Sequence, residues 1–117
     1  MLKKNIIVTT QFEGIHQYPD APEEVSYLRV PHRHMFHVQA TIEVNDNNRE
    51  LEFIMVKHRL EKLLSHHAWG PCTSCEDMAE YILKALLLWY GEQRTVQVMV
   101  TEDDENGAFV THWPDNK

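Results

Sequence analysis

A stretch of regular alternation between apolar and polar residues, from Pro31 to Val44, most constrains the fold of this chain. From residue 36 onward every second residue is apolar, and the residues between them are polar. The apolar set is Phe36, Val38, Ala40, Ile42 and Val44. This alternation is typical of a half-buried β-strand, whose side chains point to opposite faces in turn. The sequence therefore predicts a long strand with one face directed at a core.

Two histidines continue the apolar face of this strand. Counting back from Phe36 in steps of two places His34 and then His32 on the inward side. Burying an imidazole without partners costs free energy, and neutral imidazole is the commonest metal ligand in proteins. The pair therefore either binds a divalent metal or forms hydrogen bonds at the end of a strand. This stretch alone leaves both interpretations open.

A third histidine follows from an earlier strand. Ile6, Val8, Thr10 and Phe12 share one face, and the same count reaches Gly14 and His16. The next segment, Gln17 to Val30, holds two prolines within four residues and is predicted to be a loop. That loop would bring His16 beside the two histidines of the next strand. Three histidines from two strands would make a zinc site with one open position, as in catalytic rather than structural zinc.

Two helices are predicted in the middle of the chain. Apolar residues recur at helical spacing from Phe53 to His67, and Gly70-Pro71 ends this region. The second helix begins at Thr73 or Ser74, a credible N-cap with an acidic residue three positions later to complete a capping box. Gly91 is predicted to end this helix.

The last third of the chain returns to alternation. Residues 96, 98 and 100 are valines, and the same count reaches Glu102. Glu102 is either a carboxylate at the end of the inward face or the first residue of an acidic run beyond a frayed strand. Asn106-Gly107 predicts a tight hairpin turn with positive φ at both positions. Ala108 to Trp113 would form the return strand.

These elements predict a single α+β domain over residues 1–117, with a four-stranded antiparallel sheet, two helices on one face and the order β-β-α-α-β-β. The net charge of −7 argues against nucleic acid or an anionic membrane as a partner. No apolar run has the length of a membrane span, and the first residues lack the apolar core of a signal peptide. The sequence predicts a cytoplasmic protein.

Several motifs occur in a specific order along nearly the whole chain. They are Phe12-x-x-x-His16, His32-x-His34, Glu52 to Lys57, Glu76 to Ile82, and a strand that ends at Glu102. In this order and spacing they resemble the 6-pyruvoyl-tetrahydropterin synthase family, which includes the 6-carboxy-tetrahydropterin synthases of queuosine biosynthesis. The two middle motifs are similar to the family's Asp-Phe-x-x-Leu-Lys and Glu-Asn-Leu-Ala-x-Tyr-Ile.

The resemblance implies a tunnelling fold (T-fold), in which subunits join their sheets into a barrel and two rings stack, usually as a hexamer. It implies a zinc cofactor held by His16, His32 and His34. It also implies a pterin substrate, dihydroneopterin triphosphate, whose ring is anchored by Glu102. The expected activity is that of a zinc-dependent lyase acting on a pterin or purine-like small molecule within a homo-oligomer.

The chain also departs from the family's pattern. Leu28 occupies the position of the family's catalytic cysteine, and Ser65-His66 replaces an Asp-His pair, so His66 is the candidate catalytic base. Arg33 and Met35 replace a glycine and an asparagine. Three hypotheses follow. The first is a lyase that uses His66 or a metal-bound hydroxide in place of the cysteine. The second is a zinc protein of the same fold that carries out a different reaction, or none, on a pterin or nucleotide, and the third is an oligomeric scaffold with structural histidines.

Cys72 and Cys75 form a lone Cys-x-x-Cys at the predicted start of the second helix. Without a second ligand pair this is a weak zinc signal, and it has no thioredoxin-like context. A helix N-terminus would lower the pKa of both thiols and could make one a replacement nucleophile. The alternative is two free thiols near a helix cap.

Overall fold

The computed structural model describes residues 1–115 and contains four strands, two α-helices and one 3₁₀ helix. In chain order these are β1 (Lys4–His16), η1 (Glu23–Arg29), β2 (His32–Val44), α1 (Phe53–His66), α2 (Cys75–Tyr90), β3 (Val96–Glu102) and β4 (Asn106–His112). The predicted order β-β-α-α-β-β is confirmed. The addition is η1, which lies inside the segment predicted to be a loop.

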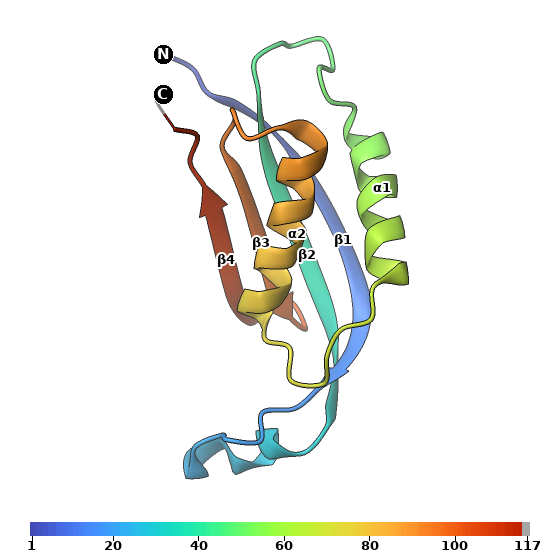
Figure 1. Cartoon of the computed structure of the whole chain (residues 1–117), viewed down its shortest axis with the longest axis vertical. Coiled ribbons are helices and arrows are strands. Elements are labelled where there is room, and N and C mark those ends of the chain that lie inside the picture. The colour runs from blue at the N-terminus through green and yellow to red at the C-terminus, as the bar shows by residue number, and fades with distance from the viewer. Residues whose placement is uncertain (116–117) are drawn as a thin grey trace.

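The strands form one antiparallel sheet in the order β1-β2-β3-β4. Both α-helices lie against the same face of this sheet, with α1 over β1 and α2 over β3 and β4 (Figure 1). The predicted α+β architecture, with a four-stranded antiparallel sheet and its helices on one face, is therefore confirmed. Among residues 1–115, no helix has the length and apolarity needed to cross a bilayer.

The core lies between the sheet and the two helices. The alternating apolar residues of β2, from Phe36 to Val44, are all buried as predicted, and so are the three valines of β3. The helices contribute Val56, Leu60 and Leu64 from α1 and Met78, Ala79, Ile82, Leu83 and Leu86 from α2. Because the three histidines share the parity of the buried residues of their strands, the sheet directs them to the same side.

Both helix starts are capped by side chains. The N-cap of α1 is Glu52, whose carboxylate accepts hydrogen bonds from the backbone N–H groups of residues 54 and 55. The predicted capping box of α2 is confirmed, with Ser74 as N-cap and Asp77 as its partner. Gly91 ends α2 with a φ of 97°, a conformation that glycine adopts without steric cost.

The hairpin turn between β3 and β4 differs from the prediction. Positive φ angles occur at Asp103 (53°) and Asp104 (61°), whereas Asn106 and Gly107 already belong to β4. The expectation of a tight turn at Asn106-Gly107 was wrong. The turn forms earlier because the backbone N–H of Asp103 donates to the carbonyl of Met35, and Asp tolerates the left-handed region better than most residues.

Gly107 serves a different purpose from the one its sequence context suggests. A Cβ at this position would lie 1.9 Å from the carbonyl oxygen of Val100, so only glycine allows this approach between β4 and β3. Glycine is thus needed at position 107 for close backbone contact and not for a positive φ.

The segment between β1 and β2 folds back on itself at one end of the sheet, where β1 and β2 extend beyond the helices (Figure 1). The backbone N–H of Tyr18 donates to the carbonyl of Leu28 at 2.8 Å, and Arg29 Nε donates to the carbonyl of Ala21 at 2.9 Å. These bonds close the loop into a compact flap next to the histidines.

Candidate metal centre

His16, His32 and His34 meet at the end of the β1–β2 ladder. The strand register pairs His16 with His32 directly and places His34 opposite Gly14. The ring centroids are 4.7 Å apart for His16 and His32, 4.9 Å for His32 and His34, and 5.3 Å for His16 and His34. One nitrogen from each ring lies within 4.8 Å of the other two. The predicted meeting of three histidines from two strands is confirmed, and the group could hold a metal ion.

The outward nitrogens of the three rings are all engaged. Nδ1 of His16 lies 2.8 Å from the Thr73 carbonyl oxygen, and Nδ1 of His32 lies 2.9 Å from the Val30 carbonyl oxygen. Nδ1 of His34 lies 2.7 Å from Oδ2 of Asp103. Carbonyl and carboxylate oxygens only accept hydrogen bonds, so each Nδ1 must carry the proton. In the neutral imidazole the Nε2 lone pair is then available to a metal.

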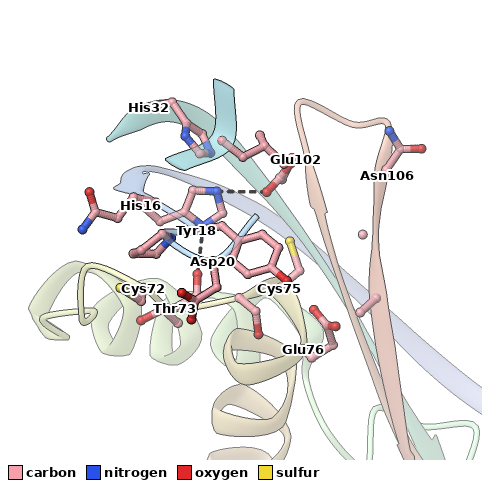
Figure 2. A pocket seen from close by; sticks show the side chains of 16 residues that line it. His16, Tyr18, Asp20, His32, Cys72, Thr73, Cys75, Glu76, Glu102 and Asn106 are labelled. Carbon is pink, nitrogen blue, oxygen red and sulfur yellow. Dashed lines mark hydrogen bonds and ion pairs between the residues drawn. The ribbon is translucent and has the colours of Figure 1, made fainter. Parts of the chain in front are cut away.

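Glu102 completes the group, as Figure 2 shows for His16, His32 and Glu102. Its Oε2 lies 3.0 Å from Nε2 of His16, and its Oε1 lies 3.6 Å from Nε2 of His34. Neither contact counts as a hydrogen bond, so both Nε2 atoms are buried without a hydrogen-bond partner. The structure therefore places Glu102 at the inward end of β3, as one of the two sequence interpretations predicted.

In this arrangement, hydrogen-bond acceptors of the histidines and of Glu102 face one another without a proton between them. A neutral imidazole with its proton on Nδ1 offers a lone pair at Nε2, and the carboxylate facing it is also an acceptor. A proton on Nε2 would resolve one such contact, but charging several neighbouring imidazoles brings like charges together. A single divalent cation resolves all of them. Three neutral imidazoles are also the donor set of open, catalytic zinc sites, so the residues present fit zinc.

A cavity of about 690 Å³ opens beside the histidines. Its walls come from the β1–β2 loop, the start of α2, the end of β3 and the start of β4 (Figure 2). Three carboxylates line it: Asp20, Glu76 and Glu102. Among the described residues, the lining includes neither lysine nor arginine. The cavity is thus suited to a ligand that donates hydrogen bonds or carries positive charge.

The two cysteines line the cavity, but Cys75 lacks the lowered pKa that was expected of a nucleophile. Leu28, which the resemblance aligns with a catalytic cysteine, lines the cavity with an inert side chain. Cys72 and Cys75 line it from the start of α2. Burial, with added repulsion from the carboxylates of Glu102 and Glu76, raises the pKa of the Cys75 thiol to about 12. The predicted lowering of the pKa by the helix N-terminus was wrong for Cys75, because desolvation of the thiolate dominates.

His66 lies apart from this cavity. It ends α1, and its Nδ1 lies 2.8 Å from the carbonyl oxygen of Lys62. Its neighbour His67 stacks on Tyr81 with ring centroids 4.0 Å apart and contacts Trp69. Within one chain, the structure does not bring His66 to the histidine cluster, and its catalytic role stays a prediction.

Asp103 belongs to the site but was not predicted from the sequence. Its carboxylate accepts from His34 Nδ1 and, at 3.0 Å, from the backbone N–H of Met35. The hydrogen bond from His34, followed by that from Met35, holds the pKa of Asp103 below its usual range. The sequence signal was an acidic residue directly after the strand that carries Glu102, but the run of four acidic residues did not show which one turns back to β2.

Compared with models of known protein families and with curated proteins, the sequence gives no match. The function of this protein is therefore inferred from the geometry of the site and from the motifs of the sequence. Of these motifs, the structure brings together the His-x-His pair of β2 and the third histidine, from β1.

Proposed function

We propose that this protein is a zinc-dependent lyase of the 6-pyruvoyl-tetrahydropterin synthase type, with a T-fold, acting on a pterin or purine-like compound. One observation supports this most strongly: three imidazoles donate their Nδ1–H groups outward, and one nitrogen of each ring lies within 4.8 Å of the other two. The Nε2 atoms of His16 and His34 also face Glu102. The order of strands and helices agrees with this proposal.

The residues divide into two roles. His16, His32 and His34 would hold the zinc, which as a Lewis acid polarises an oxygen of the bound substrate. Their Nδ1 hydrogen bonds fix the ring orientations before any ligand arrives. Glu102 would accept hydrogen bonds from the ring N–H and amino group of the heterocycle, a charge-assisted pairing. A cavity of about 690 Å³ falls in the size range of small-molecule sites.

The charge of the cavity favours binding of the heterocycle over binding of the phosphates. Asp20 and Glu76 add two further carboxylates to Glu102, and repulsion would disfavour a triphosphate against this wall. If the substrate is dihydroneopterin triphosphate, its phosphates extend away from these residues and meet cations elsewhere. In the proposed homo-oligomer, a hexamer by resemblance, a neighbouring subunit would supply them.

A second candidate is a zinc protein that binds a pterin-like compound without the lyase reaction. Two observations favour it: Leu28 replaces a thiol on the cavity wall, and His66 lies outside the cavity. A positioned general acid or base typically contributes roughly 10²–10⁴-fold to a rate, so its absence would reduce turnover severely.

One experiment separates these candidates. Zinc-loaded protein is mixed with dihydroneopterin triphosphate, and release of triphosphate and quenching of pterin fluorescence are followed together. Release that is lost in His32→Ala supports the lyase, and quenching without release supports the second candidate. His37→Ala is the matched control, because residue 37 lies on β2 but on the opposite face. Neither release nor quenching by the wild-type protein would contradict both candidates.

A further inference from the structure

Asp103 makes three hydrogen bonds that join the β3–β4 turn to β2. Its Oδ2 accepts from Nδ1 of His34 at 2.7 Å, and its Oδ1 accepts from the backbone N–H of Met35 at 3.0 Å. Its own backbone N–H donates to the Met35 carbonyl at 2.7 Å. The β2–β3 ladder ends at the pair Phe36–Glu102, so Asp103 extends the connection one step further, to the metal-facing end of β2.

The bond to His34 differs in kind from those of the other two histidines. His16 and His32 donate to backbone carbonyls, whereas His34 donates to a carboxylate. A carboxylate bound to Nδ1–H fixes the tautomer and orientation of the ring and makes its Nε2 a stronger donor to a metal. Within the cluster, His34 alone has a carboxylate partner at Nδ1.

The position of Asp103 also connects two parts of the site. It directly follows Glu102, whose carboxylate lies 3.6 Å from Nε2 of His34. A positive φ of 53° at Asp103 turns its side chain back toward β2 while the chain proceeds into the hairpin. The same turn therefore sets the place of the substrate-facing carboxylate and the orientation of one candidate metal ligand.

We infer that Asp103 is a positioning residue for the metal centre, which holds His34 in the Nδ1–H tautomer and thereby tightens zinc binding. This inference rests on the proposed zinc binding but assigns a role to a residue outside the His₃ set. A purely structural residue would stabilise the turn without affecting the affinity for zinc.

Adjacent residues provide a matched comparison. Asp104 is also an acidic residue with positive φ (61°), but its side chain makes no hydrogen bond or ion pair in the described structure. Asp103→Asn keeps a side chain that tolerates positive φ, but it has an oxygen at only one of the two positions that accept from His34 and Met35. Asp103→Gly keeps the backbone freedom and removes the carboxylate, so it serves if the Asn variant folds poorly.

The test measures zinc affinity by competition with a chromophoric chelator in the wild type, Asp103→Asn, Asp103→Gly and Asp104→Asn, each checked for folding by circular dichroism. We expect the two Asp103 variants to bind zinc roughly 10–100-fold more weakly and Asp104→Asn to stay within about two-fold of the wild type. Equal affinities in all four proteins, or an equal loss in Asp104→Asn, would overturn the inference.

A metal-free readout distinguishes this inference from the proposed function. Nitrogen chemical shifts of the His34 ring, measured by long-range ¹⁵N–¹H correlation without zinc, report which nitrogen carries the proton. We expect an Nδ1–H ring in the wild type and in Asp104→Asn, and a shifted or mixed tautomer in the Asp103 variants. If the wild type binds no zinc, the proposed function fails, while an unchanged tautomer in the Asp103 variants would independently refute the role of Asp103.

Discussion

Replacing Gly107 with alanine tests whether the close approach of β4 to β3 is required. A Cβ at this position would lie 1.9 Å from the Val100 carbonyl oxygen, 2.6 Å from Thr101 Cα and 2.8 Å from Val100 C. Carbon and oxygen atoms in ordinary contact are roughly 3.3–3.6 Å apart, so the strands must separate by more than about 1 Å. All three contacts are to backbone, which cannot rotate aside as a side chain would.

The expected cost follows from this overlap. Forcing extra atoms into a packed region typically costs about 1–3 kcal/mol, and backbone contacts place Gly107→Ala at the upper end. For a chain of this size that corresponds to a fall in Tm of roughly 8–15 °C. The assay is thermal unfolding followed by circular dichroism, with Gly70→Ala as the control, because a Cβ there would meet only Thr73 Oγ1 at 3.5 Å. If the two variants melt at the same temperature, the reasoning about this contact is wrong.

Three further predictions concern stability and reactivity. Hydrogen bonds from backbone N–H groups of the β2–α1 loop lower the pKa of Glu50 in the folded protein. The ionised Glu50 therefore stabilises the fold at pH values above its unfolded pKa of about 4.3. This stabilisation disappears as the pH falls through the lower pKa of the folded state. Glu50→Gln should therefore be less stable than the wild type near pH 7 and equally stable at strongly acidic pH, with Glu24→Gln as the control in urea titrations. Because Cys75 is buried with a pKa of about 12 and Cys72 is exposed, iodoacetamide at pH 8 should label Cys72 alone by mass spectrometry; equal labelling would contradict the structure. Phe36 is fully buried, so Phe36→Ala should lower the free energy of unfolding by about 3–5 kcal/mol, and a loss below about 1 kcal/mol would refute its place in the core.

Strand alternation is the part of this fold that the sequence specifies most directly. Side chains two positions apart on a strand lie on the same face of the sheet. The apolar Phe36 and Val38 therefore indicated that His32 and His34 also point inward. The position of His16 followed from the same parity in β1 and from the short return of the chain. These inferences needed no knowledge of distant residues.

Features that depend on distant contacts were missed or misplaced. Asn106-Gly107 is a strong local signal for a turn, but bonds between Asp103 and Met35, far away in the sequence, move the turn earlier. The pKa of Cys75 depends on burial and on Glu102, and neither is visible from its place at a helix start. In both cases tertiary contacts outweighed a local rule.

The conformation of the segment between β1 and β2 could be predicted only in part from the sequence. Its two prolines correctly excluded a strand, but they did not reveal that η1 folds the segment back over the cavity. Hydrogen bonds such as that from Tyr18 to Leu28 close it, and such pairings across a loop leave no periodic pattern.

Zinc content tests the central claim most directly. Purified protein, dialysed against a weak chelator and analysed by inductively coupled plasma mass spectrometry, should contain about one zinc per chain. His16→Ala should lose most of this zinc, while His112→Ala should retain it, because residue 112 lies on β4 and contacts the carbonyl of Glu92 instead. A wild-type protein that neither contains nor takes up zinc, or a His16→Ala variant that retains it, would contradict the account.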